Sequence, residues 1–197
     1  MHRPAVLALA VLFSVTALGH AFAAGPPLDH QAKITYEFIG FLKDGDNFLV
    51  RGVDSNMGPR YEVWDTKESE FVKVFPYTGD DEKKALYKIK REFGETQAPS
   101  EDATNPKKKD IMMLVGQKGD KLDIYMMKGD KVTKYDDIKV YKDEKTGNMA
   151  KANQKVATWD ADGKFAVIIY SQKLDEKFKS VDRDYIYSFK FKAYKVD

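Results

Sequence analysis

Short apolar runs separated by turns that contain glycine recur along this chain, and they limit its fold more than any other feature. The phrase FLKDGDNFLV covers residues 41–50, and the similar phrase WDADGKFAVI covers residues 159–168. Each places an Asp-Gly pair between two β-forming runs, which is a strong hairpin signal because glycine adopts the positive φ of a tight turn. The chain therefore predicts antiparallel hairpins, and it predicts the same strand–turn–strand unit twice.

Further turns of this kind divide the rest of the chain. The apolar runs between them predict a four-stranded meander over about residues 34–75. KGDK occurs at residues 118–121 and again at residues 128–131, and this even spacing predicts a second meander. Near the C-terminus, the residues of the last run divide into two faces, which predicts a strand with one buried and one solvent-exposed face. The buried face would carry Tyr185, Tyr187, Phe189 and Phe191, and the solvent-exposed face Ser188, Lys190 and Lys192.

One segment departs from this period. Apolar residues recur there at helical spacing and are followed by a glycine: Leu86, Ile89, Phe93 and Gly94. The pattern predicts a single helix over about residues 81–93, with the carboxylate of Asp80 or Asp81 as its N-terminal cap and its lysines facing solvent. A polar loop over residues 94–110 follows, and it is long for a compact domain.

These elements predict a mainly β fold, in which antiparallel meanders form a β-sandwich or a bent sheet with one helix. Residues 34–197 make a single all-β domain. A closed propeller needs at least four blades of about 40 residues each, and the helix and the long loop leave too little chain for that.

The first 23 residues have the pattern of a secretory signal peptide. Arg3 precedes an apolar run that is shorter than the roughly 20 residues needed to span a bilayer as a helix. Small residues at Ala21 and Ala23 predict cleavage near Ala23, which leaves a polar leader over residues 24–33. The chain has no cysteine, and this indicates a bacterial periplasmic or secreted protein. No other stretch of the sequence predicts a transmembrane segment.

Four stretches carry a resemblance to a known family: GFLKDGDNFLV from Gly40, YEVWDTKESEFV from Tyr61, and, near the end, DGKFAVIIYSQ and SVDRDYIYSF. Together they resemble a bacterial family of predicted secreted proteins of unknown function. The chain departs from that pattern at Val181, where the family has glycine before Asp182. The aromatic-x-x-Asp-Gly phrase is distantly similar to the repeats of TolB-like propellers. The resemblance implies a secreted all-β domain, and it brings no known activity or catalytic residues to this chain.

Composition argues against several classes of function. The chain has 33 basic and 31 acidic residues, without the basic excess of a nucleic-acid-binding protein. Of its three histidines, only His30 follows the expected cleavage site. This argues against Ser-His-Asp and Cys-His catalysis and against the common zinc sites. No glycine-rich phosphate loop is present. We therefore expect neither an enzyme nor a cofactor.

Four residues are candidates for ligand binding: Arg60, Asp182, Arg183 and Tyr185. The last three place a charged pair beside an aromatic ring at the entry to the final strand, and we interpret them as a structural salt bridge rather than a ligand clamp. The tryptophans Trp64 and Trp159 stand at strand spacing, which indicates core positions rather than a carbohydrate platform.

Asp160 and Asp162 are candidate metal ligands, because DADG resembles half of a calcium loop. The third acidic position and the bidentate glutamate of such a loop are missing, so a plain hairpin turn is the favoured interpretation. A run of lysines at residues 107–109, together with the basic helix face, is a candidate contact for anionic lipid or cell-wall polymer, with a solvated face as the simpler interpretation.

These observations predict a non-enzymatic β-module that binds a partner protein or a cell-envelope component through its loops. The loops concerned are residues 54–60, 94–110 and 171–184, because recognition is usually placed on loops that a rigid sheet supports. One alternative is a soluble carrier with an internal cavity for a small ligand. A second is a hydrolase of envelope glycans that uses a pair of carboxylates.

Overall fold

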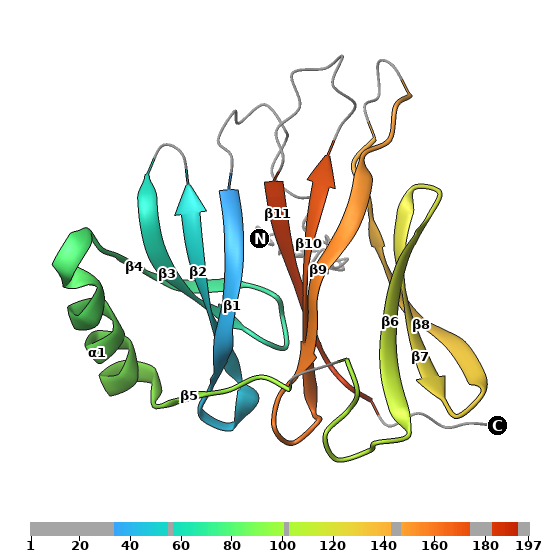
Figure 1. The fold of residues 1–197 in the computed structure, drawn as a ribbon, viewed down its shortest axis with the longest axis horizontal. Helices are drawn as coiled ribbons and strands as arrows, with labels where there is room; N and C mark the ends of the chain where they lie inside the picture. Colours follow the sequence, from blue (N-terminus) through green and yellow to red (C-terminus); the bar gives the residue numbers. More distant parts are fainter. Residues whose placement is uncertain (1–33, 55–56, 101–102, 143–146, 174–182, 193–197) are drawn as a thin grey trace, which may run out of the picture.

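Three antiparallel sheets and one α-helix make up the computed structural model, and the sheets stay open rather than closing into a propeller (Figure 1). The mainly β fold class is confirmed. The structure describes residues 34–54, 57–100, 103–142, 147–173 and 183–192. The predicted signal peptide and leader lie outside these ranges.

The first sheet contains the predicted meander. Its strands are β1 (Ile34–Leu42), β2 (Asn47–Asp54), β3 (Gly58–Asp65), β4 (Phe71–Pro76) and the short β5 (Thr96–Gln97). They lie in the order β4-β3-β2-β1-β5, so β4 and β5 are the edge strands. The four-stranded meander over residues 34–75 is therefore confirmed, and part of the long polar loop adds a fifth strand to it.

Two three-stranded sheets follow. The outer sheet contains β6 (Ile111–Lys118), β7 (Lys121–Lys128) and β8 (Lys131–Lys139), and the central sheet contains β9 (Lys151–Trp159), β10 (Phe165–Lys173) and β11 (Arg183–Lys190). Each KGDK phrase is a two-residue hairpin, since Lys118 lies opposite Lys121 and Lys128 opposite Lys131. The predicted second meander is confirmed.

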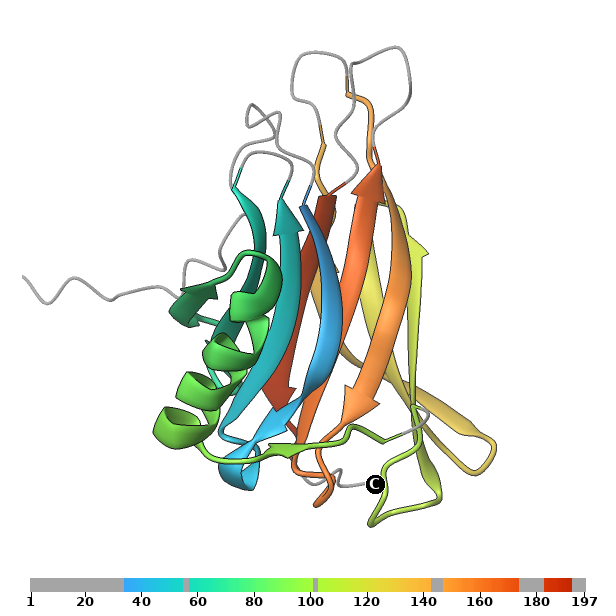
Figure 2. The ribbon, with the colours of Figure 1, turned by 60° about the vertical axis from the view of Figure 1, so that its left-hand side comes forward.

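β10 is covered on both of its faces, because successive side chains of a strand point to opposite sides. One set packs with the first sheet in a single apolar cluster of Phe41, Phe48, Val50, Phe165, Val167 and Ile169. The other set packs with the outer sheet, in a cluster that includes Ala166, Ile168, Tyr170, Met113, Leu122 and Ile124. The central sheet therefore lies between the other two, as the two views show (Figures 1 and 2).

The helix α1 (Glu82–Phe93) covers the opposite face of the first sheet, where Ala85 and Ile89 join a third apolar cluster. A 3₁₀ turn, η2 (Gly79–Asp81), leads into the helix, and Gly94 at φ 92° follows it. The predicted helix is confirmed.

Two details of the helix prediction are wrong. Neither Asp80 nor Asp81 caps the helix: Asp81 stands at the cap position in a helical conformation, and its carboxylate binds Lys84 Nζ at 2.7 Å instead. A capping side chain normally needs an extended backbone at that position. In addition, the buried stripe begins at Ala85 rather than at the half-exposed Leu86, because it repeats every four residues through Ile89 to Phe93.

The two Asp-Gly phrases lie against each other. The first turn is η1 (Lys43–Gly45), between β1 and β2, and the second joins β9 to β10. A Cβ atom on Gly45, whose φ is 77°, would come within 2.9 Å of the Asp160 carboxylate and of the Phe165 ring. Since the strands that follow both turns share the cluster around Phe48 and Phe165, the repeated phrase builds two halves of one core.

The predicted solvent-exposed face of the last strand is wrong in part: Lys190 and Lys192 are exposed, but Ser188 is buried. Tyr185, Tyr187 and Phe189 pack toward the outer sheet as expected. On the opposite face, however, Asp184 and Ser188 are also buried, because that face is turned to the first sheet. Where the strand lies between two layers, its polar residues must find partners inside the protein; only its C-terminal end, at Lys190, reaches solvent.

Candidate functional site

A buried group of charged side chains lies between the first and central sheets. Arg60 of β3 occupies its centre, with Nε 2.6 Å from Glu62 Oε1 and Nη1 3.5 Å from Asp54 Oδ2. All three residues are more than nine-tenths buried. Burying a charge costs free energy unless the charge is paired, so Arg60 is what allows both carboxylates to stay here.

Hydrogen bonds extend this group into the central sheet. The backbone N–H of Tyr36 donates to Asp184 Oδ2 at 2.8 Å, and Lys155 Nζ donates to the same oxygen. Trp64 Nε1 donates to Glu62 Oε2 at 3.0 Å. Burial, reinforced by the Glu62 carboxylate, raises the pKa of Tyr36, which keeps its hydroxyl protonated. We call these residues the ionic cluster: Tyr36, Asp54, Arg60, Glu62, Lys155 and Asp184.

The sequence candidates divide between two faces of the central sheet. Arg60 belongs to the ionic cluster, and Arg183 precedes the cluster residue Asp184 at the start of β11. Tyr185 points the other way, toward the outer sheet, where it stacks on Tyr170 with 5.5 Å between ring centroids. The Arg183 guanidinium lies 5.7 Å from the Tyr185 ring centroid. Asp182 lies outside the described residues, so its pairing with Arg183 stays a prediction.

The arrangement of charges in the ionic cluster indicates a structural role rather than a catalytic one. A pair of catalytic carboxylates needs one protonated and one ionised group in a cleft that admits substrate. Asp54 and Glu62 instead share Arg60, and they are closed off between the layers. The cluster therefore joins the first and central sheets through charge-assisted hydrogen bonds.

The DADG turn uses its buried carboxylate internally. Asp160 Oδ1 accepts the backbone N–H of Lys164 at 2.7 Å and that of Phe165 at 2.8 Å. Asp162 is exposed and pairs with Lys164 Nζ at 2.9 Å. Across the part of the chain that the structure describes, no group of three or more acidic, histidine or cysteine side chains is placed to hold a metal ion. These hydrogen bonds describe a hairpin turn that Asp160 closes.

Replacement of Asp160 by alanine is expected to lower the free energy of unfolding by about 1–3 kcal/mol, because the buried N–H of Phe165 and the partly buried N–H of Lys164 lose their acceptor. Asp162→Ala, in the same turn but at the surface, is expected to change it little. Urea unfolding of both variants, with and without calcium, measures this. Equal losses in the two variants, or a calcium-dependent rise in stability, would contradict the internal role of Asp160.

The predicted binding loops do not all lie at one end of the molecule. Asp54 pairs with Ile34 at the start of β1, and Asp184 binds Tyr36 nearby, so the ends of the 54–60 and 171–184 segments meet there. β5 pairs with the last residues of β1, which places the start of the 94–110 segment at the opposite end (Figure 1). Residues 55–56, 101–102 and 174–182 lie outside the described ranges.

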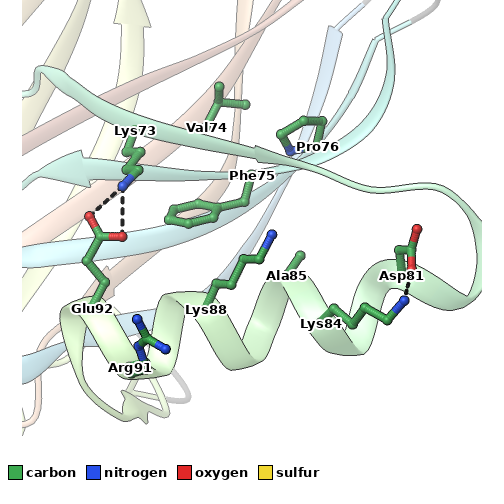
Figure 3. A pocket seen from close by; sticks show the side chains of 10 residues that line it. All are labelled: Lys73, Val74, Phe75, Pro76, Asp81, Lys84, Ala85, Lys88, Arg91 and Glu92. Atoms are coloured by element: carbon green, nitrogen blue, oxygen red, sulfur yellow. Dashed lines mark hydrogen bonds and ion pairs between the residues drawn. The ribbon is translucent and has the colours of Figure 1, made fainter.

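An open groove of about 960 Å3 separates the edge strand β4 from α1 (Figure 3). Its floor is largely apolar, and its helical side is basic; the lining residues are Lys73, Val74, Phe75, Pro76, Asp81, Lys84, Ala85, Lys88, Arg91 and Glu92. Both acidic residues are paired, Glu92 with Lys73 and Asp81 with Lys84. Lys88 and Arg91 form no ion pair with any residue that the structure describes.

The exposed side of α1 continues this basic surface. Lys83, Lys84, Lys88 and Arg91 surround the ring of Tyr87, which is 66% exposed. Exposed aromatic and arginine side chains are enriched at protein interfaces. The lysines at residues 107–109 do not join this surface, since Lys108 lies over the ring of Phe191, which packs with the outer sheet.

Comparisons with known proteins leave the site to be interpreted from its geometry alone. No family model, no curated protein and no solved structure matches this chain. The resemblance to a secreted bacterial family therefore stays a prediction. Among the residues that the structure describes, no helix has the length and apolar character needed to cross a membrane.

Proposed function

We propose that this chain is a secreted, non-enzymatic binding module that holds an anionic partner in the groove between β4 and α1. The partner is a protein or a cell-envelope component. The observation that carries the proposal is the pair Lys88 and Arg91, two cations that form no ion pair with any described residue, beside an apolar floor. Secretion rests on the signal-peptide pattern of residues 1–23.

The buried carboxylates support a non-enzymatic role. Each one named here has a partner inside the fold: Asp54 and Glu62 have Arg60, Asp184 has Lys155, Asp123 has Lys134, and Asp160 has two backbone N–H groups. This differs from a glycosidase, in which one desolvated acid stays protonated in an open cleft.

The packing between the layers supports surface binding over the carrier alternative. Large side chains that are fully buried, such as Trp159, Phe41 and Phe48, occupy the spaces between the sheets. A carrier would instead keep a lined cavity of several hundred Å3 for its ligand. The groove at α1 is open to solvent, which suits a macromolecular partner. Recognition by the 54–60 and 171–184 loops stays a prediction.

Charge reversal of the groove tests this function. Poly-L-glutamate is expected to bind the mature protein at about 50 mM salt and to dissociate at about 300 mM, where exposed charges are screened within several ångströms. The Lys88→Glu/Arg91→Glu variant is expected to lose about tenfold or more in affinity, because rim charges steer and hold an anionic partner. Fluorescence anisotropy with labelled poly-L-glutamate measures both effects.

The matched control carries the same change of net charge elsewhere. Lys118→Glu/Lys139→Glu alters two exposed lysines of the outer sheet and is expected to keep the affinity within about twofold. Equal losses in the two double variants would mean that only the net charge matters, and the groove would then not be the binding site.

A further inference from the structure

We infer that the partner of this groove is a protein whose extended segment adds to the edge of β4 as a further strand of the first sheet. The segment alternates acidic residues, which face α1, with apolar residues, which face away from it. This inference rests on the proposed function, since it names the kind of partner and how the groove binds it. Strand addition to an open sheet edge is a general mode of peptide recognition.

The backbone of β4 is open on one side. Within the described residues β4 pairs with β3 alone, and Arg60 lies opposite Pro76. The next pair is hydrogen-bonded, because Tyr77 N–H donates to the carbonyl of Pro59 at 3.5 Å. Hydrogen-bonded and non-hydrogen-bonded pairs alternate along an antiparallel ladder. The N–H and C=O of Val74 therefore point away from β3, toward the free edge, where they are available to another strand.

Proline at Pro76 agrees with this geometry. A proline within a sheet is found where its missing N–H would point to solvent, on an edge strand. Pro76 lies two residues after Val74 on the same strand, so its backbone has the same orientation. Its carbonyl therefore points to the free edge, and it has no N–H. An added strand would consequently form hydrogen bonds with the N–H and C=O of Val74 and with the carbonyl of Pro76.

The two faces beside this edge differ in chemistry, and this predicts the alternation of the segment. Lys73 and Phe75 point toward α1, where Lys88 extends from the helix into the groove, while Val74 points the other way (Figure 3). On the side away from the helix lie Val74, opposite Glu62, and Phe71, whose ring packs on Trp64; they are 40% and 51% exposed. Because side chains alternate along a strand, every second residue of the segment would meet cations, and the residues between would meet this apolar surface.

The groove also sets the length of the segment. The stripe of α1 that lines it extends from Asp81 to Glu92. At about 1.5 Å per residue this stripe is about 17 Å long, which corresponds to about five residues of an extended strand. A segment of this length would place two or three acidic side chains opposite Lys84, Lys88 and Arg91.

The positive charge beside β4 argues against a second copy of this chain as the partner at this edge. A second copy of this chain that paired β4 to β4 would bring Lys84, Lys88 and Arg91 of each protomer close to the same residues of the other. Like charges placed opposite each other across an interface cost several kcal/mol. An acidic segment removes that repulsion, and its apolar residues cover Phe71 and Val74.

Peptide binding tests the inference. The first probe contains five alternating glutamate and valine residues between Gly-Ser flanks, and the second has the same composition with its glutamates and valines in separate blocks. The alternating peptide is expected to bind about tenfold more tightly, because only its pattern matches both faces. Two further peptides carry N-methyl groups on one or the other alternate set of backbone nitrogens. Strand addition predicts that one set abolishes binding and that the other is tolerated.

A protein variant tests the same edge from the other side. Val74→Pro removes the N–H that points to the free edge without removing a bond to β3, and it is expected to weaken the alternating peptide about tenfold. Val74→Ala keeps the N–H and is expected to stay within about threefold. Circular dichroism of both variants checks that they fold. If Val74→Pro does not fold, the methylated peptides with the unchanged protein decide whether strand addition occurs.

Each outcome separates the inference from the proposed function. If both peptides bind alike, and Lys88→Glu/Arg91→Glu abolishes both, strand addition is overturned while the groove keeps its function. If vesicles with anionic lipid bind through Lys88 and Arg91 but neither peptide does, the groove takes a lipid surface and the inference is overturned. If neither the peptides, the vesicles nor poly-L-glutamate bind, both proposals are wrong.

Discussion

Arg60→Met is expected to destabilise the protein by about 3–5 kcal/mol, the largest loss that we expect from any charged residue described here. The substitution removes the one cation that Asp54 and Glu62 share, and it leaves two buried carboxylates next to each other. For a domain of this size each kcal/mol shifts the midpoint of thermal unfolding by roughly 2–4 °C, so the midpoint should fall by about 10 °C. Calorimetry or circular dichroism measures this shift.

Arg51 offers a matched control on the neighbouring strand. It lies on the helix-covered face of the first sheet, where it is partly exposed, pairs loosely with Glu37 and Glu82, and donates from Nε to the Tyr77 hydroxyl at 2.6 Å. Arg51→Met is expected to cost about 1–2 kcal/mol, because it removes one hydrogen bond and two surface pairs but leaves no buried charge unpaired. The triple variant Asp54→Asn/Arg60→Met/Glu62→Gln should recover much of the loss, since no buried charge is then unpaired. An Arg60→Met protein as stable as the wild type would disprove the structural role of the ionic cluster.

Trp159→Ala is expected to lower the free energy of unfolding by about 3–5 kcal/mol. Trp159 is fully buried, packs edge-to-face on Phe189 and Phe191, and donates from Nε1 to the carbonyl of Ala103 at 2.7 Å. The substitution leaves a large cavity between the central and outer sheets and a buried carbonyl without its donor. Urea unfolding, followed by circular dichroism, measures the loss.

The other tryptophan provides the comparison. Trp64 is only partly buried, beside the cluster between the first and central sheets, so Trp64→Ala should cost less than Trp159→Ala. Because the chain has two tryptophans, Trp64→Phe leaves Trp159 as the sole indole fluorophore, and its emission should be blue-shifted by burial. A red-shifted emission, or a loss below about 1.5 kcal/mol in Trp159→Ala, would show that the packing around Trp159 is looser than described.

Local pattern predicted most of the elements of this fold, because the signals for turns and periods lie within a few residues. The Asp-Gly and KGDK turns gave the hairpins, and the spacing of Ile89 and Phe93 gave the helix. The stacking of the sheets depends instead on contacts between distant strands. For this reason Ser188 of β11 was expected in solvent and is buried against the first sheet, where it binds Ser69.

The candidate site was predictable only in part. Arg60 was identified, and its partner Glu62 stands two residues away on the same face of β3, which alternation alone could have indicated. Asp184 and Lys155 could not be found in this way, because they come from another sheet more than 90 residues further on. The basic face of α1 was visible in the sequence. The groove beside it was not, because the edge position of β4 follows from the strand order.

The position of β10 between two layers also has a consequence for misfolding. Its segment FAVIIY, residues 165–170, has no charge, proline or glycine, and every one of its residues is buried. Uncharged segments of this kind with high β-propensity readily form intermolecular cross-β structure when they are exposed. Variants that loosen the sheets on either side should therefore be lost to aggregation before they accumulate as unfolded monomers, and their yield during expression should follow how well β10 stays covered.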